Sequence, residues 1–174
     1  SVKPKYRPNG ARILPCVIEL VNAAAGFLPD ATLLFSTASQ RTAMGTEALP
    51  QPTSERIGTG IRGIDLILGG GLMPGSVQLI VGRPGSGKTI FANQVAFHRA
   101  AAGFNAVYVT LLAESHARML THLACFSFFN PELVSRRIVY MSGHSVLEQA
   151  GLDGLLDLLT RTIRENSASL LVID

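Results

Sequence analysis

Hydrophobic residues in the later two thirds of the chain follow two spacings, one typical of buried strands and one typical of amphipathic helices. Short apolar segments rich in β-branched residues predict strands buried on both faces. Apolar residues three and four positions apart predict helices. The predicted strands cover residues 76–81, 105–112, 137–141 and 169–174, and the predicted helices cover residues 61–68, 88–102, 115–127 and 145–166. Strands and helices alternate from residue 76 onward, which indicates an α/β fold with a parallel sheet.

Two details of the helical pattern carry further expectations. Ser145 and Glu148 have the spacing of a capping box, which predicts the start of the last helix. One apolar stripe is predicted along that helix, formed by Leu152, Leu155, Leu156, Leu159 and Ile163.

The first 52 residues lack such a pattern. Prolines at positions 4, 8, 15, 29, 50 and 52 break the candidate elements into short pieces. Within this part, residues 17–25 favour a short helix that ends at Gly26, and residues 32–36 favour an extended piece. We therefore predict an irregular, partly disordered N-terminal extension over residues 1–52, with a folded subdomain as the alternative, and a second unit over residues 53–174.

The most specific motif follows the first predicted strand of the α/β part. It is Gly82-Arg83-Pro84-Gly85-Ser86-Gly87-Lys88-Thr89, which fits the phosphate-binding loop pattern G-x-x-x-x-G-K-[ST]. A strand precedes it and a helix follows it, which is the context that the motif requires. A glycine-rich turn without a ligand is the alternative, but this pattern arises by chance in a chain of this length in about one case in a hundred or less.

The residue types of this loop explain how it would hold a nucleotide. Glycines allow positive φ angles and let backbone N–H groups surround phosphate oxygens, while Pro84 stiffens the loop. Lys88 would reach the β and γ phosphates, and the Thr89 hydroxyl would coordinate Mg²⁺. The candidate nucleotide-binding residues are Gly82, Pro84, Gly85, Ser86, Gly87, Lys88, Thr89 and Ile90.

A second candidate site residue ends the last predicted strand. Leu170 to Ile173 are apolar, and Asp174 follows them. A buried strand that places one carboxylate at its C-terminal end supplies the second wall of a Mg²⁺-nucleotide site, the Walker B role. We therefore expect Asp174 to act with Thr89 on the metal side; a surface acid at a strand end is the alternative.

Composition narrows the class of protein. The net charge of +3 is small and is not concentrated in either part of the chain, so it gives no sign of a nucleic-acid-binding surface. The two cysteines, Cys16 and Cys125, are too far apart for a zinc motif or a disulfide framework, which favours a reducing cytoplasm. No uncharged segment free of Gly and Pro is long enough to span a membrane.

Several segments together resemble one family. They are residues 59–65 (Thr-Gly-Ile-Arg-Gly-Ile-Asp), 68–72 (Leu-Gly-Gly-Gly-Leu), 74–76 (Pro-Gly-Ser), the phosphate-binding loop, and 107–110 (Val-Tyr-Val-Thr). Over residues 55–174 the chain resembles the KaiC-like branch of the RecA-fold P-loop ATPases, a group that also contains the RadA-type recombinases. The glycine-rich segment before the loop separates this group from other P-loop families better than the loop itself does.

The resemblance implies an activity and a set of partners. It implies ATP and Mg²⁺ as ligands and a ring-like homo-oligomer with nucleotide between subunits. A role at a membrane is not expected, because no segment is long enough to span one. Carboxylates after the second strand of the family polarise the attacking water, and the matching residue here is Glu114, with Lys88 as the other catalytic residue. The family usually has two adjacent acids, whereas this chain has Ala113 before Glu114.

The resemblance also implies a strand that follows the Walker B strand and inserts between it and the P-loop strand. The sequence stops at Asp174, so the predicted sheet is incomplete at its C-terminal side, with a gap of about 10 Å between the two nucleotide-contacting strands. Either the chain is part of a longer one, or another segment fills the gap. We expect ATP binding with weak or absent turnover; the alternatives are a RadA-type DNA-recombination ATPase and a nucleotide-sensing module that does not hydrolyse ATP.

Overall fold

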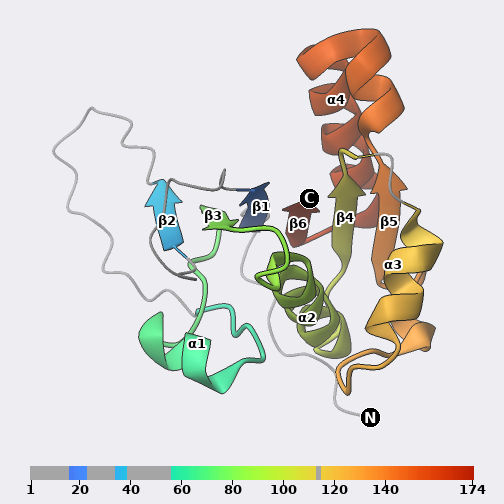
Figure 1. The fold of residues 1–174 in the computed structure, drawn as a ribbon. Coiled ribbons are helices and arrows are strands. Elements are labelled where there is room, and N and C mark those ends of the chain that lie inside the picture. The colour runs from blue at the N-terminus through green and yellow to red at the C-terminus, as the bar shows by residue number, and fades with distance from the viewer. Residues whose placement is uncertain (1–15, 23–33, 39–55, 113–114) are drawn as a thin grey trace, which may run out of the picture.

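A computed structural model describes residues 16–22, 34–38, 56–112 and 115–174 (Figure 1). In chain order, its elements are β1 (Cys16–Asn22), β2 (Leu34–Ala38), α1 (Arg62–Ile67), β3 (Val77–Gly82), α2 (Lys88–Ala101), β4 (Ala106–Thr110), α3 (His116–Leu123), the 3₁₀ helix η1 (Pro131–Leu133), β5 (Ile138–Ser142), α4 (His144–Asn166) and β6 (Leu170–Ile173). The predicted alternation of strands and helices after residue 76 is confirmed, with end points that differ by up to four residues.

The strands of the described residues form one sheet of six in the order β2-β3-β1-β6-β4-β5. Five neighbouring strands are parallel, and β2 at the edge is antiparallel to β3. The parallel α/β fold predicted from the alternation of elements is therefore confirmed. In parallel strands the C-terminal ends meet at one edge of the sheet, which is where ligands bind in folds of this class.

The sheet has no gap between the P-loop strand and the Walker B strand, because β1 lies there. Residues 17–22 pair with β3 over residues 77–82, and residues 16–19 pair with β6 over residues 170–173. The sequence left two alternatives for this gap, a longer chain or another segment that fills it. The structure shows the second, with β1 as the segment. β3 and β6 are thus held at a fixed distance by a strand that hydrogen-bonds to both.

β1 and β2 correct the prediction for the first 52 residues. The helix predicted over residues 17–25 is wrong, because residues 16–22 form a parallel strand; residues 23–25 lie outside the described residues. The extended piece predicted over residues 32–36 overlaps β2, so two parts of the predicted irregular extension belong to the sheet. The division of the chain at residue 52 stays a prediction.

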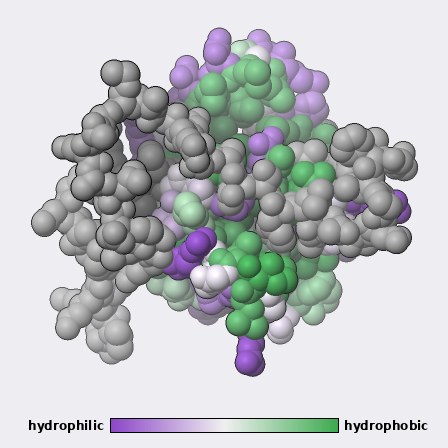
Figure 2. All heavy atoms as spheres, turned by 90° about the vertical axis from the view of Figure 1, so that its left-hand side faces the viewer, coloured by the Kyte–Doolittle hydropathy of each residue, from purple (hydrophilic) through white to green (hydrophobic). Residues whose placement is uncertain are grey.

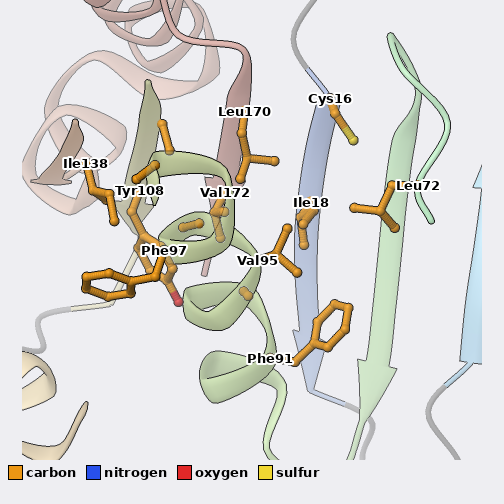
Figure 3. Packing of buried hydrophobic residues seen from close by; sticks show 14 of the residues in the cluster. Cys16, Ile18, Leu72, Phe91, Val95, Phe97, Tyr108, Ile138, Leu170 and Val172 are labelled. Atoms are coloured by element: carbon orange, nitrogen blue, oxygen red, sulfur yellow. The ribbon is translucent and has the colours of Figure 1, made fainter. Parts of the chain in front are cut away.

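The core has one layer of side chains on each face of the sheet. On one face, α2 packs Phe91, Val95 and Phe97 against strand residues that include Ile18 and Tyr108 (Figure 3). On the other face, α4 packs Leu155 and Leu159 against residues of β4 and β6.

β1 contributes its buried side chains to the α2 face of this core. Cys16 and Ile18 are both 0% exposed, whereas Glu19, which points to the opposite face of the strand, is exposed. Burial raises the pKa of the Cys16 thiol to about 11, against a small opposing effect of Arg99. The thiol is therefore neutral at ordinary pH and behaves as a small apolar side chain.

α4 differs from its predicted pattern in two ways. Its N-cap is Gly143 and Ser145 lies inside the helix, so the predicted capping box is absent. Glu148 instead lies close to another side chain of the first turn, with its Oε2 atom 3.6 Å from His144 Nδ1. The backbone breaks the helix at Gly151, where φ is 65°. The predicted stripe is narrower than expected: Leu152 and Leu156 are 70% and 58% exposed, while Leu155 and Leu159 are buried.

The glycine-rich segment before β3 closes on itself as a short antiparallel bridge. Ile57 and Leu72 exchange both backbone N–H···O bonds, each 2.8 Å long. Beside this bridge Gly71 has a φ of 124°, and a Cβ on Gly71 would lie 2.2 Å from the carbonyl oxygen of Ile57. Only glycine fits at position 71, which accounts for the third residue of the Gly69-Gly70-Gly71 run.

We expect Gly71→Ala to lower the free energy of unfolding by about 3 kcal/mol or more, since it adds a backbone clash to an unfavourable φ. The matched control is Gly69→Ala, where φ is also positive, at 64°, but no atom lies within 4 Å of the added Cβ. The control should cost about 1 kcal/mol. Urea denaturation of the two variants compares them, and equal losses would contradict the close approach at position 71.

α1 lies below the sheet edge formed by β2 and β3 and contributes no buried residue. Figure 2 looks at this side of the molecule, and hydrophobic side chains gather on its lower part. Leu66 and Ile67 of α1 are 74% and 78% exposed. Among the helices of the described residues, none is both long and apolar enough to cross a membrane.

Candidate nucleotide-binding site

The loop between β3 and α2 has the backbone shape that the motif predicts. Gly85 and Gly87 have φ angles of 79° and 88°, and Gly87 is the N-cap of α2. Gly82 differs from the expectation, because it ends β3 without a positive φ. The first turn of α2 therefore begins at the loop, where its free N–H groups and the positive end of its dipole favour an anion.

Lys88 lies inside this loop rather than in solvent. Its side chain is 6% exposed, and Nζ donates to the carbonyl oxygens of Gly82 at 3.0 Å and of Arg83 at 2.9 Å. A buried ammonium group with two carbonyl acceptors has a third N–H available for a ligand. The charge is therefore held at the centre of the loop, at the place where the motif predicts phosphate.

Asp174 lies beside the start of α2, as expected for the second wall of the site. Thr89 Oγ1 donates to Asp174 Oδ2 at 3.0 Å, and the hydroxyl of Tyr108 donates to the same oxygen at 2.8 Å. The backbone of Asp174 is fixed as well, because its N–H donates to Val109 and its carbonyl oxygen accepts from Leu111. The sheet thus brings together a hydroxyl and a carboxylate that are 85 residues apart in the chain.

These groups surround a cleft of about 340 Å³ at the C-terminal edge of the sheet. Its walls are the loop and the first residues of α2, the ends of β4 and β6, and the start of α3. The predicted residues Pro84, Gly85, Gly87, Lys88, Thr89, Ile90 and Asp174 all line it. The volume is in the range typical of pockets that bind small molecules and cofactors.

One buried polar atom of the loop has no partner within the described part of the protein. Ser86 Oγ is buried and makes no hydrogen bond there, although its backbone N–H donates to Arg83. A buried hydroxyl without a partner carries a desolvation cost that a ligand oxygen would remove. This observation and the position of Lys88 fit a phosphate group in the loop.

The oxygen atoms at the mouth of the cleft fit a magnesium ion. Mg²⁺ prefers oxygen ligands and is usually held by one or two carboxylates together with substrate phosphates and water. Thr89 and Asp174 supply one hydroxyl and one carboxylate side by side. Among the described residues no group of three or more His, Cys, Asp or Glu could hold a metal ion.

Glu114, the predicted catalytic base, lies outside the described residues. The nearest described residues on either side, Leu112 and Ser115, line the cleft, and Ser115 is the N-cap of α3.

Sequence reasoning missed three side chains near the cleft: Tyr108, Thr110 and His116. Tyr108 and Thr110 lie two residues apart on β4, so both point to the face that α2 covers. Thr110 Oγ1 and His116 Nε2 share a hydrogen bond of 2.9 Å at the wall of the cleft. A signal for Tyr108 and Thr110 was present in the sequence: they are the two hydroxyl-bearing residues of an otherwise apolar strand, and they lie two positions apart, so they share one face.

The comparisons with known proteins agree with this geometry. A family model described as "ATPase: KaiC" matches residues 57–174. The DNA repair protein RadA of Mycobacterium tuberculosis is 48% identical over 52 residues, which is 30% of this chain and 11% of that protein. The DNA repair and recombination protein RadB of Halobacterium salinarum is 38% identical over 92 residues, which is 53% of this chain and 39% of that protein.

A third relative is the circadian clock protein KaiC3 of a Synechocystis species, 46% identical over 56 residues, which is 32% of this chain and 11% of that protein. The chain therefore spans well under half the length of these relatives. No solved structure is significantly similar to it.

Proposed function

Because the chain belongs to the KaiC family of ATPases, we propose that it binds Mg·ATP in the cleft at the C-terminal edge of its sheet. The observation that carries this proposal is the loop itself, with buried Lys88 at its centre and a Ser86 hydroxyl that has no hydrogen-bond partner among the described residues. The triphosphate would lie along the loop N–H groups at the start of α2.

Thr89 and Asp174, whose side chains are in hydrogen-bond contact, would hold the metal. When bound, it neutralises phosphate charge and favours transfer of the terminal phosphoryl group. The chain's own contribution is to orient these two oxygen ligands, to hold Lys88 close to the phosphates, and to keep both sides of the cleft fixed through β1.

We further propose that the bound ATP is hydrolysed, with Glu114 as the base that takes a proton from the attacking water. Weak turnover was expected because the sheet was predicted to have a gap and because Ala113 stands where the family usually has an acid. β1 removes the first of these two reasons. The hydrogen bond between Thr89 and Asp174 supports the view that β3 and β6 are close enough for residues at both ends to contact one bound nucleotide.

Glu114→Gln should lower the rate of phosphate release from ATP about 100-fold, because general-base catalysis by a carboxylate contributes that much or more. The Kd for ATP should change less than about threefold, since the amide is similar in size and Lys88 is untouched. Phosphate release and equilibrium binding of a fluorescent ATP analogue measure the two effects. Wild-type protein that binds ATP without releasing phosphate would instead favour the nucleotide-sensing module.

Two further expectations belong to this proposal. The resemblance to KaiC-like ATPases suggests a ring-like homo-oligomer, which sedimentation velocity with and without Mg·ATP would detect. Cys16 and Cys125 are both free, which fits action in a reducing cytoplasm. No described residue offers a specific observation that favours DNA as a partner.

A further inference from the structure

Tyr108 is a buried side chain that reaches the site only through another residue. It is 0% exposed in the middle of β4, and it does not line the cleft. Its hydroxyl nevertheless donates to Asp174 Oδ2 at 2.8 Å, at the end of the neighbouring strand. A buried tyrosine needs a partner for its hydroxyl, and here the partner is the carboxylate proposed to face the metal.

We infer that Tyr108 is a positioning residue, whose hydroxyl holds the Asp174 carboxylate in the orientation that binds nucleotide-bound magnesium. This inference rests on the proposed function. A carboxylate at the end of a strand can rotate about its side-chain bonds, and each orientation presents different oxygen atoms to the cleft. A hydrogen bond from a neutral donor to a charged acceptor is stronger than one between neutral groups, so the Tyr108 hydroxyl restricts that rotation.

The two hydrogen bonds to Asp174 differ in where they come from. Thr89 lines the cleft and is itself a proposed metal ligand, so its hydroxyl is part of the site. Tyr108 approaches from the core, and its ring is fixed by packing in the cluster between α2 and the sheet (Figure 3). The Tyr108 hydroxyl can therefore keep its hydrogen bond to Asp174 when the Thr89 hydroxyl turns from Asp174 to the metal. Outer partners of this kind commonly change metal affinity 10- to 100-fold when they are removed.

A second tyrosine next to the first makes a matched comparison possible. The rings of Tyr108 and Tyr140 are 5.2 Å apart, and Tyr140 lies on the neighbouring strand β5. The hydroxyl of Tyr140 donates to Asn93 Oδ1 at 2.7 Å, and Asn93 in turn donates to the backbone of Thr89 at 2.8 Å. Each hydroxyl thus donates one side-chain hydrogen bond, that of Tyr140 to Asn93 in α2 and that of Tyr108 to the Asp174 carboxylate.

The test compares Tyr108→Phe with Tyr140→Phe, each of which removes one hydrogen-bonded hydroxyl and keeps the ring. The Kd of a fluorescent ATP analogue is measured once in EDTA and once in saturating MgCl₂, and the ratio of the two gives the gain in affinity due to magnesium. We expect Tyr108→Phe to reduce this gain about tenfold while the Kd in EDTA stays within about twofold of wild type. Tyr140→Phe should leave the gain unchanged.

A double variant checks that the effect passes through the carboxylate. Asp174→Asn should itself reduce the magnesium gain, and adding Tyr108→Phe to it should produce little further loss, because residues that act as a unit are not additive. An unchanged gain in Tyr108→Phe, an equal loss in Tyr140→Phe, or a fully additive double variant would each overturn the inference. Failure of the proposed function gives a different result, since the wild-type protein would then not bind the ATP analogue in either condition.

Discussion

Lys88→Ala is expected to raise the Kd for ATP about 100-fold or more, both in EDTA and in MgCl₂. Lys88 is the buried charge at the centre of the loop, and its Nζ is held by the carbonyl oxygens of Gly82 and Arg83. Truncating one partner of a buried charge pair costs about 2–5 kcal/mol in binding free energy, which corresponds to this loss. Isothermal titration calorimetry with the wild type and the variant measures it.

Thr89→Ala provides the matched control for this prediction, since it changes the next residue of the same helical turn. The Thr89 hydroxyl contacts Asp174 on the metal side and not the loop carbonyls, so its loss should lower ATP affinity in MgCl₂ and leave affinity in EDTA nearly unchanged. Thermal unfolding of both variants without nucleotide checks that the fold is kept. ATP binding by Lys88→Ala at the wild-type level would rule out the proposed position of the phosphates.

Ile18→Ala is expected to lower the free energy of unfolding by about 3 kcal/mol, the middle of the range for a buried Ile truncated to Ala. Ile18 is 0% exposed in β1 and belongs to the same cluster as Val95 and Val172. Its strand pairs with β3 on one side and β6 on the other, so a cavity at this position weakens the strand that holds β3 and β6 together. Urea denaturation followed by far-ultraviolet circular dichroism gives the value.

Glu19→Ala tests the same strand one residue further on. Glu19 points to the opposite face of β1 and is exposed, so its truncation should change stability by less than about 0.5 kcal/mol. An irregular, partly disordered extension over residues 1–52, as the sequence alone suggests, predicts no such contrast between the two variants. Equal and small effects at both positions would therefore contradict the place of β1 inside the sheet.

Local patterns were sufficient for most of the elements that carry the site. The loop, the helix after it and the strand before Asp174 each have a signal within a few residues of chain, and Lys88 and Asp174 were identified from those signals. Their roles in binding stay predictions. Positions fixed by backbone requirements, such as Gly87 at the start of α2, are also visible in the sequence because few residue types can occupy them.

Features that depend on distant partners could not be predicted in the same way. β1 alternates buried Cys16 and Ile18 with exposed Glu19, but alternation over so few residues is ambiguous between a strand and a helix. What makes residues 16–22 a strand is pairing with β3 and β6, neither of which is near it in sequence. Tyr108 is similar, because its role depends on a carboxylate 66 residues away.

The central place of β1 also determines when the cleft can form during folding. β1 comes from near the start of the described chain and β6 from its last residues, so their pairing closes a loop that contains nearly everything between them. Closing so large a loop costs entropy before any contact compensates for it, which makes such pairings slow. During synthesis, the two walls of the cleft therefore cannot meet until residues 170–173 have left the ribosome. A nucleotide that binds only the completed cleft then stabilises the final folded state and not an early folding intermediate.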